Sequence, residues 1–408
     1  MLLNYLKLSL RLLARNPFFT FINLAGLSIG FAVFFILWPF TQAELKSDQF
    51  ITNHEQIVRV YLDFRWTDNN GESWGHLNVA TVNNPVGPAM QNHSQIEDYT
   101  RLIPQPYFWE GNTPHLKSEI VASIEGGEYS PVLHKIEHSI CADKNFFEFF
   151  DLPFVAGDRS TSLNHAESVV LSQKMSKIIF GDKDPIGKFL KVNGSVFNVT
   201  GVFYDVPLNS HLQFGMVFSN EGSLSEWNQS SASSSGLSHL YFHMKGDPAQ
   251  IADILNKNKE SLIGSLLEKN PHIKIDFVSQ PLSEIAFSNN YSGDTFKPKS
   301  RFTLNILAGV SVVVLMMAWM NYVNLTISRT KARFKEIAAR KVSGALLPDL
   351  FLQFICQSAV LNLLACVIGL TFIQIVRGPF DYLLNIKTIP FSAIDSGTIL
   401  FFIGPKSA

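Results

Sequence analysis

Three long stretches of the chain contain no Asp, Glu, Lys or Arg, and this feature limits the possible folds more than any other. They run from Phe18 to Phe40, from Leu304 to Leu325 and from Leu350 to Val376. About 20 helical residues span the hydrocarbon core of a bilayer, so each stretch is long enough to cross it. The alternative is a buried core helix. Composition favours the membrane, because only 16% of the residues are charged, against about 25% in an ordinary soluble domain.

The N-terminal segment has three basic and no acidic side chains in residues 1–17. A cleaved signal peptide has an apolar region of about 7 to 15 residues. The apolar region here is longer, and Trp38-Pro39-Phe40-Thr41-Gln42 offers no pair of small residues for cleavage. We therefore expect a cytoplasmic amphipathic segment at 1–17, which leads into an uncleaved transmembrane helix at 18–40.

The distribution of basic residues predicts the topology. Residues 328–349 carry six basic and two acidic side chains. Lys and Arg near membrane ends favour the cytoplasm, which places residues 41–303 outside. We expect transmembrane helices at 304–326 and 350–376, and an incomplete last helix from about residue 397. The predicted fold is an α-helical transmembrane bundle with a large inserted α+β domain in the periplasm.

The external segment 41–303 has local signals of mixed structure. Asn193-Gly194 stands between two β-prone runs, which is a strong hairpin signal because a type I′ turn needs positive φ at both central positions. Apolar spacing predicts helices at Ala249–Glu268 and Ser172–Ile179. We expect an α+β domain of two lobes.

No convincing catalytic set is present in the sequence. Between Gly181 and Gly187 there are five residues instead of the four of a P-loop, and Phe189 stands where a magnesium-binding hydroxyl belongs. His134 and His138 have metal-like spacing on a helix but no evident third ligand, and Cys141 is a lone thiol. The net charge of −1 gives no basic field for nucleic acid. We therefore expect a protein that is not an enzyme and holds no cofactor or metal.

The basic loop at 328–349 has two interpretations. It is either a topology signal alone or a short cytoplasmic helix that docks in a partner's groove. The second is favoured by the helical spacing of Phe334, Ile337, Ala338 and Lys341 and by a C-cap glycine at Gly344.

Several motifs resemble those of the MacB/FtsX-type ABC transporter permease family, most closely its Bacteroidetes branch. In the basic loop, Arg333-Phe334-Lys335-Glu336-Ile337-Ala338-Ala339-Arg340-Lys341-Val342-Ser343-Gly344-Ala345 is similar to the family's "R-x-K-E-I-x-x-R-K-x-x-G-A" pattern. In the external segment, the residues from Ala142 to Phe154, from Asp184 to Lys188 and from Gly201 to Leu212 resemble its MacB-like periplasmic core domain. The resemblance covers essentially the whole chain, with residues 304–408 corresponding to an FtsX-like permease domain.

The resemblance implies the permease subunit of a multi-pass inner-membrane transporter, coupled to a separate cytoplasmic ABC ATPase that binds the ATP. The implied ATPase-coupling loop comprises Arg333, Lys335, Glu336, Ile337, Arg340, Lys341, Gly344 and Ala345. A homodimer or paired permease, membrane lipid and a periplasmic or outer-membrane partner are also implied, with efflux or export as the activity. The alternatives are a non-transporting mechanotransmitting regulator of envelope proteins and a truncated, non-functional permease fragment.

Two departures from the family pattern are visible. Leu347 stands where members usually have a basic residue, and Gln357 stands where they often have an acidic one.

Overall fold

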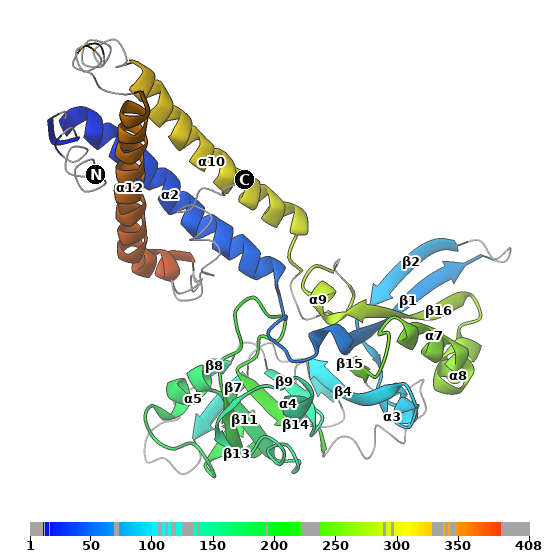
Figure 1. The fold of residues 1–408 in the computed structure, drawn as a ribbon. Coiled ribbons are helices and arrows are strands. Elements are labelled where there is room, and N and C mark those ends of the chain that lie inside the picture. The colour runs from blue at the N-terminus through cyan, green and yellow to red at the C-terminus, as the bar shows by residue number, and fades with distance from the viewer. Residues whose placement is uncertain are drawn as a thin grey trace. The chain divides into compact units, whose positions relative to one another are not determined.

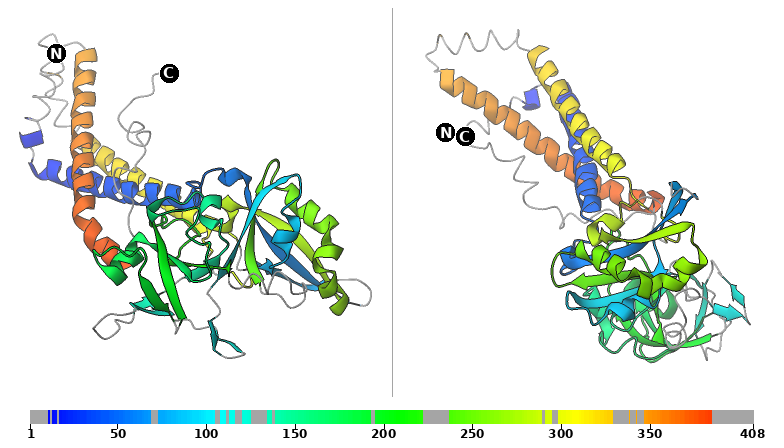
Figure 2. Two further views of the ribbon diagram at one scale, coloured as in Figure 1. Left: turned by 90° about the horizontal axis from the view of Figure 1, so that it is seen from below. Right: turned by 90° about the vertical axis from the view of Figure 1, so that its right-hand side faces the viewer.

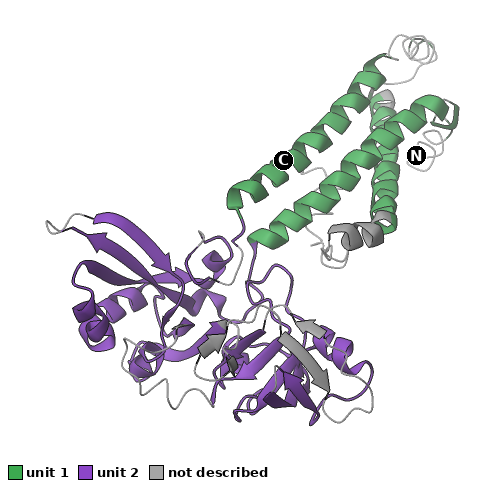
Figure 3. Ribbon diagram, turned by 180° about the vertical axis from the view of Figure 1, so that it is seen from behind, with its two compact units in different colours: residues 1–45, 300–408 green, residues 46–299 purple. Residues whose placement is uncertain are grey.

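The computed structural model divides the chain into two compact units. One unit comprises Met1–Leu45 with Ser300–Ala408, and the other comprises Lys46–Lys299 (Figure 3). The residues described are 11, 13–15, 17–68, 73–104, 108–110, 113–115, 120–124, 134–136, 139–192, 195–221, 237–288, 291–294, 298–328, 338, 342 and 347–384.

The first unit contains three long helices, α2 (Pro17–Leu45), α10 (Arg301–Ser328) and α12 (Leu347–Leu384). Within the described residues, these three helices are long and apolar enough to cross a membrane. Each continues past the charge-free stretch that the sequence analysis identified, because flanking polar residues can remain helical at the bilayer surface. The region from residue 397 onward lies outside the described residues, and so does most of segment 1–17.

Helix α2 packs against both α10 and α12, and it runs alongside α10 (Figure 1 and Figure 2). Small residues allow these close approaches. A Cβ placed on Gly30 of α2 would lie 2.5 Å from the Ala318 Cβ of α10, and one on Gly369 of α12 would lie 2.8 Å from the Ser28 carbonyl of α2. The Tyr322 hydroxyl of α10 also lies 2.8 Å from the Ser358 Oγ of α12, a polar contact of the kind that joins helices in lipid.

The second unit is built on a mixed sheet of 14 strands among the described residues. Along its main path the strands are β16 (Ile273–Pro281), β1 (Ile57–Thr67), β15 (Leu237–Met244), β4 (Ile96–Pro104), β9 (Ser139–Ala142), β14 (Met216–Ser219), β11 (Ser168–Ser172), β13 (Ser195–Phe203), β12 (Phe189–Val192), β7 (Ile120–Ile124) and β8 (His134–Ile136). Off this path lie β2 (Ser73–Val79), β3 (Val82–Asn83) and β10 (Phe154–Gly157), and a separate ribbon is formed by β5 (Phe108–Glu110) and β6 (Thr113–His115).

The sheet passes through two lobes that meet where β4 pairs with β9. The first lobe contains β16, β1, β15 and β4, with α7 (Gln250–Lys257) and α8 (Lys259–Lys269) packed against β16 (Figure 1). Short helices are η1 (His54–Gln56), α3 (Val86–Met90) and α9 (Leu282–Ile285). The prediction of helical structure over Ala249–Glu268 is confirmed, but the segment forms two consecutive helices instead of one. The chain leaves helical geometry between Lys257 and Lys259.

The second lobe confirms two local predictions. Strands β12 and β13 pair antiparallel, with Val192 opposite Ser195, so the hairpin forms as expected, although the turn residues themselves lie outside the described residues. Helix α5 (Gln173–Phe180) follows an N-cap at Ser172, whose Oγ accepts from the Met175 amide at 3.2 Å. The segment from Gly181 leads into β12 as a loop.

An aromatic cluster fills the core between the lobes. It is centred on α4 (Phe146–Phe149), where Phe146, Phe147 and Phe150 are fully buried. Phe150 packs edge-on against Tyr241 of β15 at a centroid distance of 5.3 Å, and Phe147 lies 5.4 Å from Phe203 of β13. The cluster therefore joins a strand of the first lobe to strands of the second.

Candidate functional site

The second unit begins with a buried acidic residue. Ser47 and Asp48 follow directly after α2 ends at Leu45, and both are essentially inaccessible to solvent. Asp48 has a positive φ of 61°, a backbone conformation that Asp tolerates better than most residues. Such a conformation persists where surrounding contacts fix it, and Asp48 has several.

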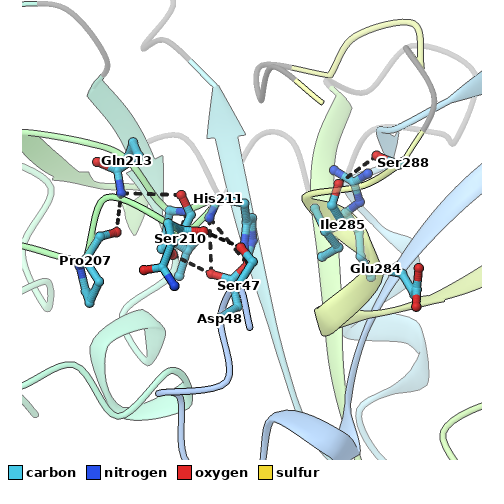
Figure 4. Close-up of polar contacts among 12 residues, drawn as sticks. Ser47, Asp48, Pro207, Ser210, His211, Gln213, Glu284, Ile285 and Ser288 are labelled. Atoms are coloured by element: carbon cyan, nitrogen blue, oxygen red, sulfur yellow. Dashed lines mark hydrogen bonds and ion pairs between the residues drawn. The ribbon is translucent and has the colours of Figure 1, made fainter. Parts of the chain in front are cut away.

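Asp48 is held by the loop that joins β13 to β14 (Figure 4). The His211 Nδ1 lies 2.8 Å from Asp48 Oδ2, and the His211 amide donates to Oδ1 at 3.1 Å. Ser210 Oγ donates to Oδ1, and Ser47 Oγ, whose single proton goes to the Asn209 carbonyl, lies 3.1 Å from Oδ2. On its other side, His211 Nε2 lies 3.1 Å from the Tyr241 hydroxyl of β15.

Electrostatics decides the charge of Asp48. Burial alone raises the pKa of the carboxyl group, but His211 and the surrounding hydrogen bonds outweigh this effect and hold the pKa below its ordinary value. Asp48 is therefore ionised at neutral pH, as a carboxylate that accepts hydrogen bonds from the Ser210 hydroxyl and the His211 amide can be. Burial also raises the pKa of Tyr241, which stays a neutral phenol.

A second ion pair continues this polar arrangement through the sheet. Arg59 of β1 donates through Nη1 to Asp294 Oδ1 at 3.2 Å and through Nη2 to Asp294 Oδ2 at 3.0 Å. Its Nε and Nη2 also donate to Gln280 Oε1 of β16 at 3.1 and 2.8 Å, and the Arg59 charge acts on the nearby Tyr241 hydroxyl. We call the set Ser47, Asp48, Arg59, Ser210, His211, Tyr241 and Asp294 the junction network, because it runs from the start of the unit to the segment near its end.

The loop from Pro207 to Gln213 is held in shape by its own hydrogen bonds, and it also contacts the last residue of the α+β unit. Gln213 Nε2 donates to the Pro207 carbonyl at 2.7 Å, and the Leu212 amide donates to Ser210 Oγ at 3.0 Å. The Asn209 carbonyl accepts from Ser47 Oγ and also from Lys299 Nζ, the latter at 3.0 Å. Lys299 is the last residue of the unit before α10.

A separate buried ion pair joins the two lobes. Arg101 of β4 donates through Nε to Asp143 Oδ2 at 2.9 Å and through Nη2 to Asp143 Oδ1 at 3.1 Å. Arg101 Nη1 also donates to the Asn84 carbonyl at 2.9 Å, and Asn220 Nδ2 lies 3.3 Å from Asp143 Oδ1. This pair fixes the β4–β9 boundary.

The arrangement is suited to holding chain segments together rather than to chemistry on a ligand. The network side chains are almost fully inaccessible, so no substrate atom reaches them. Within the described ranges, no group of three or more His, Cys, Asp or Glu side chains could hold a metal ion. His134 lies in strand β8 and not on a helix, so the helical His134/His138 spacing considered from the sequence does not apply. Burial raises the pKa of the Cys141 thiol to about 12, so the thiol is a poor nucleophile.

The predicted coupling residues Arg333, Lys335, Glu336, Ile337, Arg340, Lys341, Gly344 and Ala345 all lie outside the described residues. Conversely, no sequence pattern assigned a role to Asp48 or His211, which are 163 positions apart. The only signal was that the stretch from Gly201 to Leu212 resembles a family motif.

The chain is similar to one known protein family and to several known relatives. The family described as the MacB-like periplasmic core domain matches residues 20–255. The pyoverdine export ATP-binding/permease protein PvdT of Pseudomonas syringae pv. syringae is 23% identical over 273 residues, which are 64% of this chain and 38% of that protein. The macrolide export ATP-binding/permease protein MacB of Wolinella succinogenes is 20% identical over 399 residues, which are 91% of this chain and 53% of that protein.

A solved structure also aligns with the chain. The periplasmic region of MacB from Actinobacillus actinomycetemcomitans aligns with a TM-score of 0.34 at 15% identity, over 60% of this chain and 96% of that one. The chain spans about 38% of the length of the first relative.

Proposed function

Because the chain belongs to the family of MacB-like ABC transporter permeases, we propose that it is a permease subunit driven by a separate cytoplasmic ABC ATPase. The observation that carries the proposal is the family match over residues 20–255, which starts within the first apolar helix and continues into the α+β unit. The presence of two further apolar helices after that unit supports it. ATP is bound and hydrolysed by the partner subunit.

The mechanism we propose is rigid-body transmission. The ATPase binds the basic loop that contains Arg333, Lys335, Glu336, Ile337, Arg340, Lys341, Gly344 and Ala345. Helices α10 and α12 flank this loop in the sequence, so ATP-driven closure displaces them, and the α+β unit in the periplasm responds. The activity is export or efflux, and the functional assembly pairs two permease chains in the inner membrane.

Docking is tested by co-purification of the full chain with its candidate ATPase. We expect Glu336→Lys and Arg340→Glu each to weaken the association at least tenfold, because each reverses a charge in the proposed contact. The matched control is Lys259→Glu, a charge reversal on the surface of α8, which should leave association unchanged. Tight binding by both loop variants would contradict docking through this loop.

Topology is tested by labelling of single cysteines in intact cells. The proposal places Lys335 in the cytoplasm and Asn193 in the periplasm. A membrane-impermeant maleimide should therefore label Asn193→Cys and not Lys335→Cys until the membrane is permeabilised. Equal labelling of both positions in intact cells contradicts the arrangement.

The second candidate function is a mechanotransmitting regulator of envelope proteins, which uses the same coupling without transport. Like the exporter, it depends on a coherent α+β unit, which the junction network and the Lys299–Asn209 hydrogen bond hold together near both points of chain entry. Crosslinking from the 46–299 unit in cells separates the two functions. An exporter should capture a channel-forming envelope protein, and a regulator should capture an envelope enzyme.

A further inference from the structure

The two chain connections of the α+β unit meet at one backbone oxygen. Ser47 lies two residues after the end of α2, and Lys299 lies two residues before the start of α10. Both side chains donate to the Asn209 carbonyl, Lys299 Nζ at 3.0 Å. The acceptor belongs to neither connection, because it lies in the loop between β13 and β14 of the second lobe.

The loop is built to pass on a displacement rather than to absorb it. Gln213 binds back to Pro207, and Ser210 Oγ caps the Leu212 amide. Leu212 is fully buried in the aromatic core, and Ser210 and His211 are nearly so. Strand β14 begins at Met216, only three residues after Gln213, and β13 ends at Phe203. A displacement of Asn209 therefore moves the strands on both sides of the loop.

The junction network supplies a second, charged attachment. Asp48 follows Ser47 in the first connection and has two contacts with His211: the amide donates to Oδ1 at 3.1 Å, and Nδ1 lies 2.8 Å from Oδ2. Loss of the His211 contacts would leave the ionised Asp48 carboxylate buried without them, which is costly for a charge shielded from water. Such a contact is either made or broken, with no intermediate of low energy, which is what a transmission joint requires.

We propose that the Pro207–Gln213 loop is a joint that locks the two membrane-helix connections to each other and to the second lobe. The loop couples the connections because Ser47 and Lys299 both donate to the Asn209 carbonyl oxygen. Both hydrogen bonds are therefore lost if the loop moves away. Displacement of one connection thus reaches the other through Asn209, and it reaches β14 through the braced loop. The inference rests on the proposed function only in assigning the driving displacement to an ATPase.

The joint is tested in the full chain in detergent, without any ATPase, by amide hydrogen exchange of three segments: 46–52, 207–215 and 298–304. Lys299→Met removes the donor on the second connection, and Ser47→Ala removes the donor on the first. We expect Lys299→Met to speed exchange of 46–52 at least threefold, and Ser47→Ala to speed exchange of 298–304 by a similar factor, since coupling between two sites is reciprocal. Lys299→Arg should restore the original rates.

Two controls make the result specific. Lys259→Met removes a cation from a surface ion pair with Asp276 in the first lobe and should leave all three segments unchanged. Gln213→Ala removes the hydrogen bond from Gln213 to Pro207 and leaves the Ser47 and Lys299 donors in place. When it is combined with Lys299→Met or Ser47→Ala, the increase in exchange at the opposite connection should fall below threefold. The amides of Leu240 and Phe242 on β15 report the stability of the core, and they should exchange at the original rate in every variant.

Two outcomes overturn the proposal. If each variant alters only the segment that contains the substitution, the connections are independent and the loop joins nothing. If β15 amides exchange faster together with the three segments, the contacts stabilise the whole unit and do not form a separate joint. Because no ATPase is present, either failure leaves the proposed function untouched, and loss of ATPase binding in the co-purification leaves this result untouched.

Discussion

The Arg59 guanidinium and the Asp294 carboxylate form a two-point ion pair in the core of the α+β unit, with Nη2 and Oδ2 3.0 Å apart and both side chains almost fully buried. The pair joins the second strand of the sheet path to the segment that leads toward α10. Its energetic weight can be tested directly, because removal of one member leaves the other charged in a nonpolar environment.

Asp294→Ala should lower the free energy of unfolding by about 3 to 5 kcal/mol. Removal of one member of a buried ion pair leaves the other member charged and away from water. The measurement is urea unfolding of the full chain in detergent, followed by tryptophan fluorescence. The control, Lys259→Met, breaks a partly exposed pair with Asp276 and should change the free energy by less than about 1 kcal/mol. Equal effects of the two substitutions would show that the Arg59 site is not energetically distinct.

Stability of the same unit should depend on pH through His239. Burial, with a contribution from the nearby Arg59 charge, lowers the pKa of His239 to about 4. In the unfolded chain the pKa of histidine is about 6.5. Between these values the unfolded state binds a proton that the folded state does not, so stability should fall as the pH falls, by about 1.4 kcal/mol for each pH unit. Asp48, whose pKa is lowered, adds a loss only below about pH 4.

Urea midpoints at pH 7.5 and pH 5 measure this dependence. His239→Gln should reduce the difference between the two midpoints, because the substituted side chain does not titrate. His76→Gln changes an exposed histidine on β2 and should keep the difference as it is. A His239→Gln protein with an unchanged pH dependence would assign the effect to other groups.

The folded chain should protect Cys141 from alkylation. Burial raises the pKa of this thiol to about 12, and the thiolate is the reactive form. In a Cys356→Ser/Cys366→Ser background, iodoacetamide at pH 8 should modify Cys141 more than a hundred times faster in urea than in the native protein. Comparable rates in the two conditions would place the thiol at an open surface.

The elements predicted correctly from the sequence are those with local signals. The three apolar helices follow from length and lack of charge, and the β12–β13 hairpin follows from turn chemistry between adjacent strands. Helix α5 follows from apolar spacing, and its Ser172 cap lies at the predicted start. Each of these depends on residues close together in the chain.

The parts that the sequence left open depend on distant pairs. Strand β1 pairs with β16, which lies more than 200 positions later, as Val58 opposite Pro281 shows, and no local pattern encodes that register. The Asp48–His211 contact also joins residues far apart in the sequence, 163 positions from each other. A lone aspartate after an apolar helix has the sequence signature of a solvated surface residue, and only the folded chain shows that it is buried.

The close approach of α2 and α10 gives a final prediction within the helical unit. A Cβ on Gly30 would lie 2.5 Å from the Ala318 Cβ, whereas a Cβ on Gly309 of α10 meets nothing within 4 Å. Gly30→Leu should therefore force the helices apart, at a cost of about 1 to 3 kcal/mol for overpacking. We expect the midpoint of thermal aggregation in detergent to fall by at least about 2 °C for Gly30→Leu. The same substitution at Gly309 should leave it unchanged or slightly raised, because leucine has the higher helix propensity. Similar midpoints for the two variants would show that Gly30 is not at a tight helix contact.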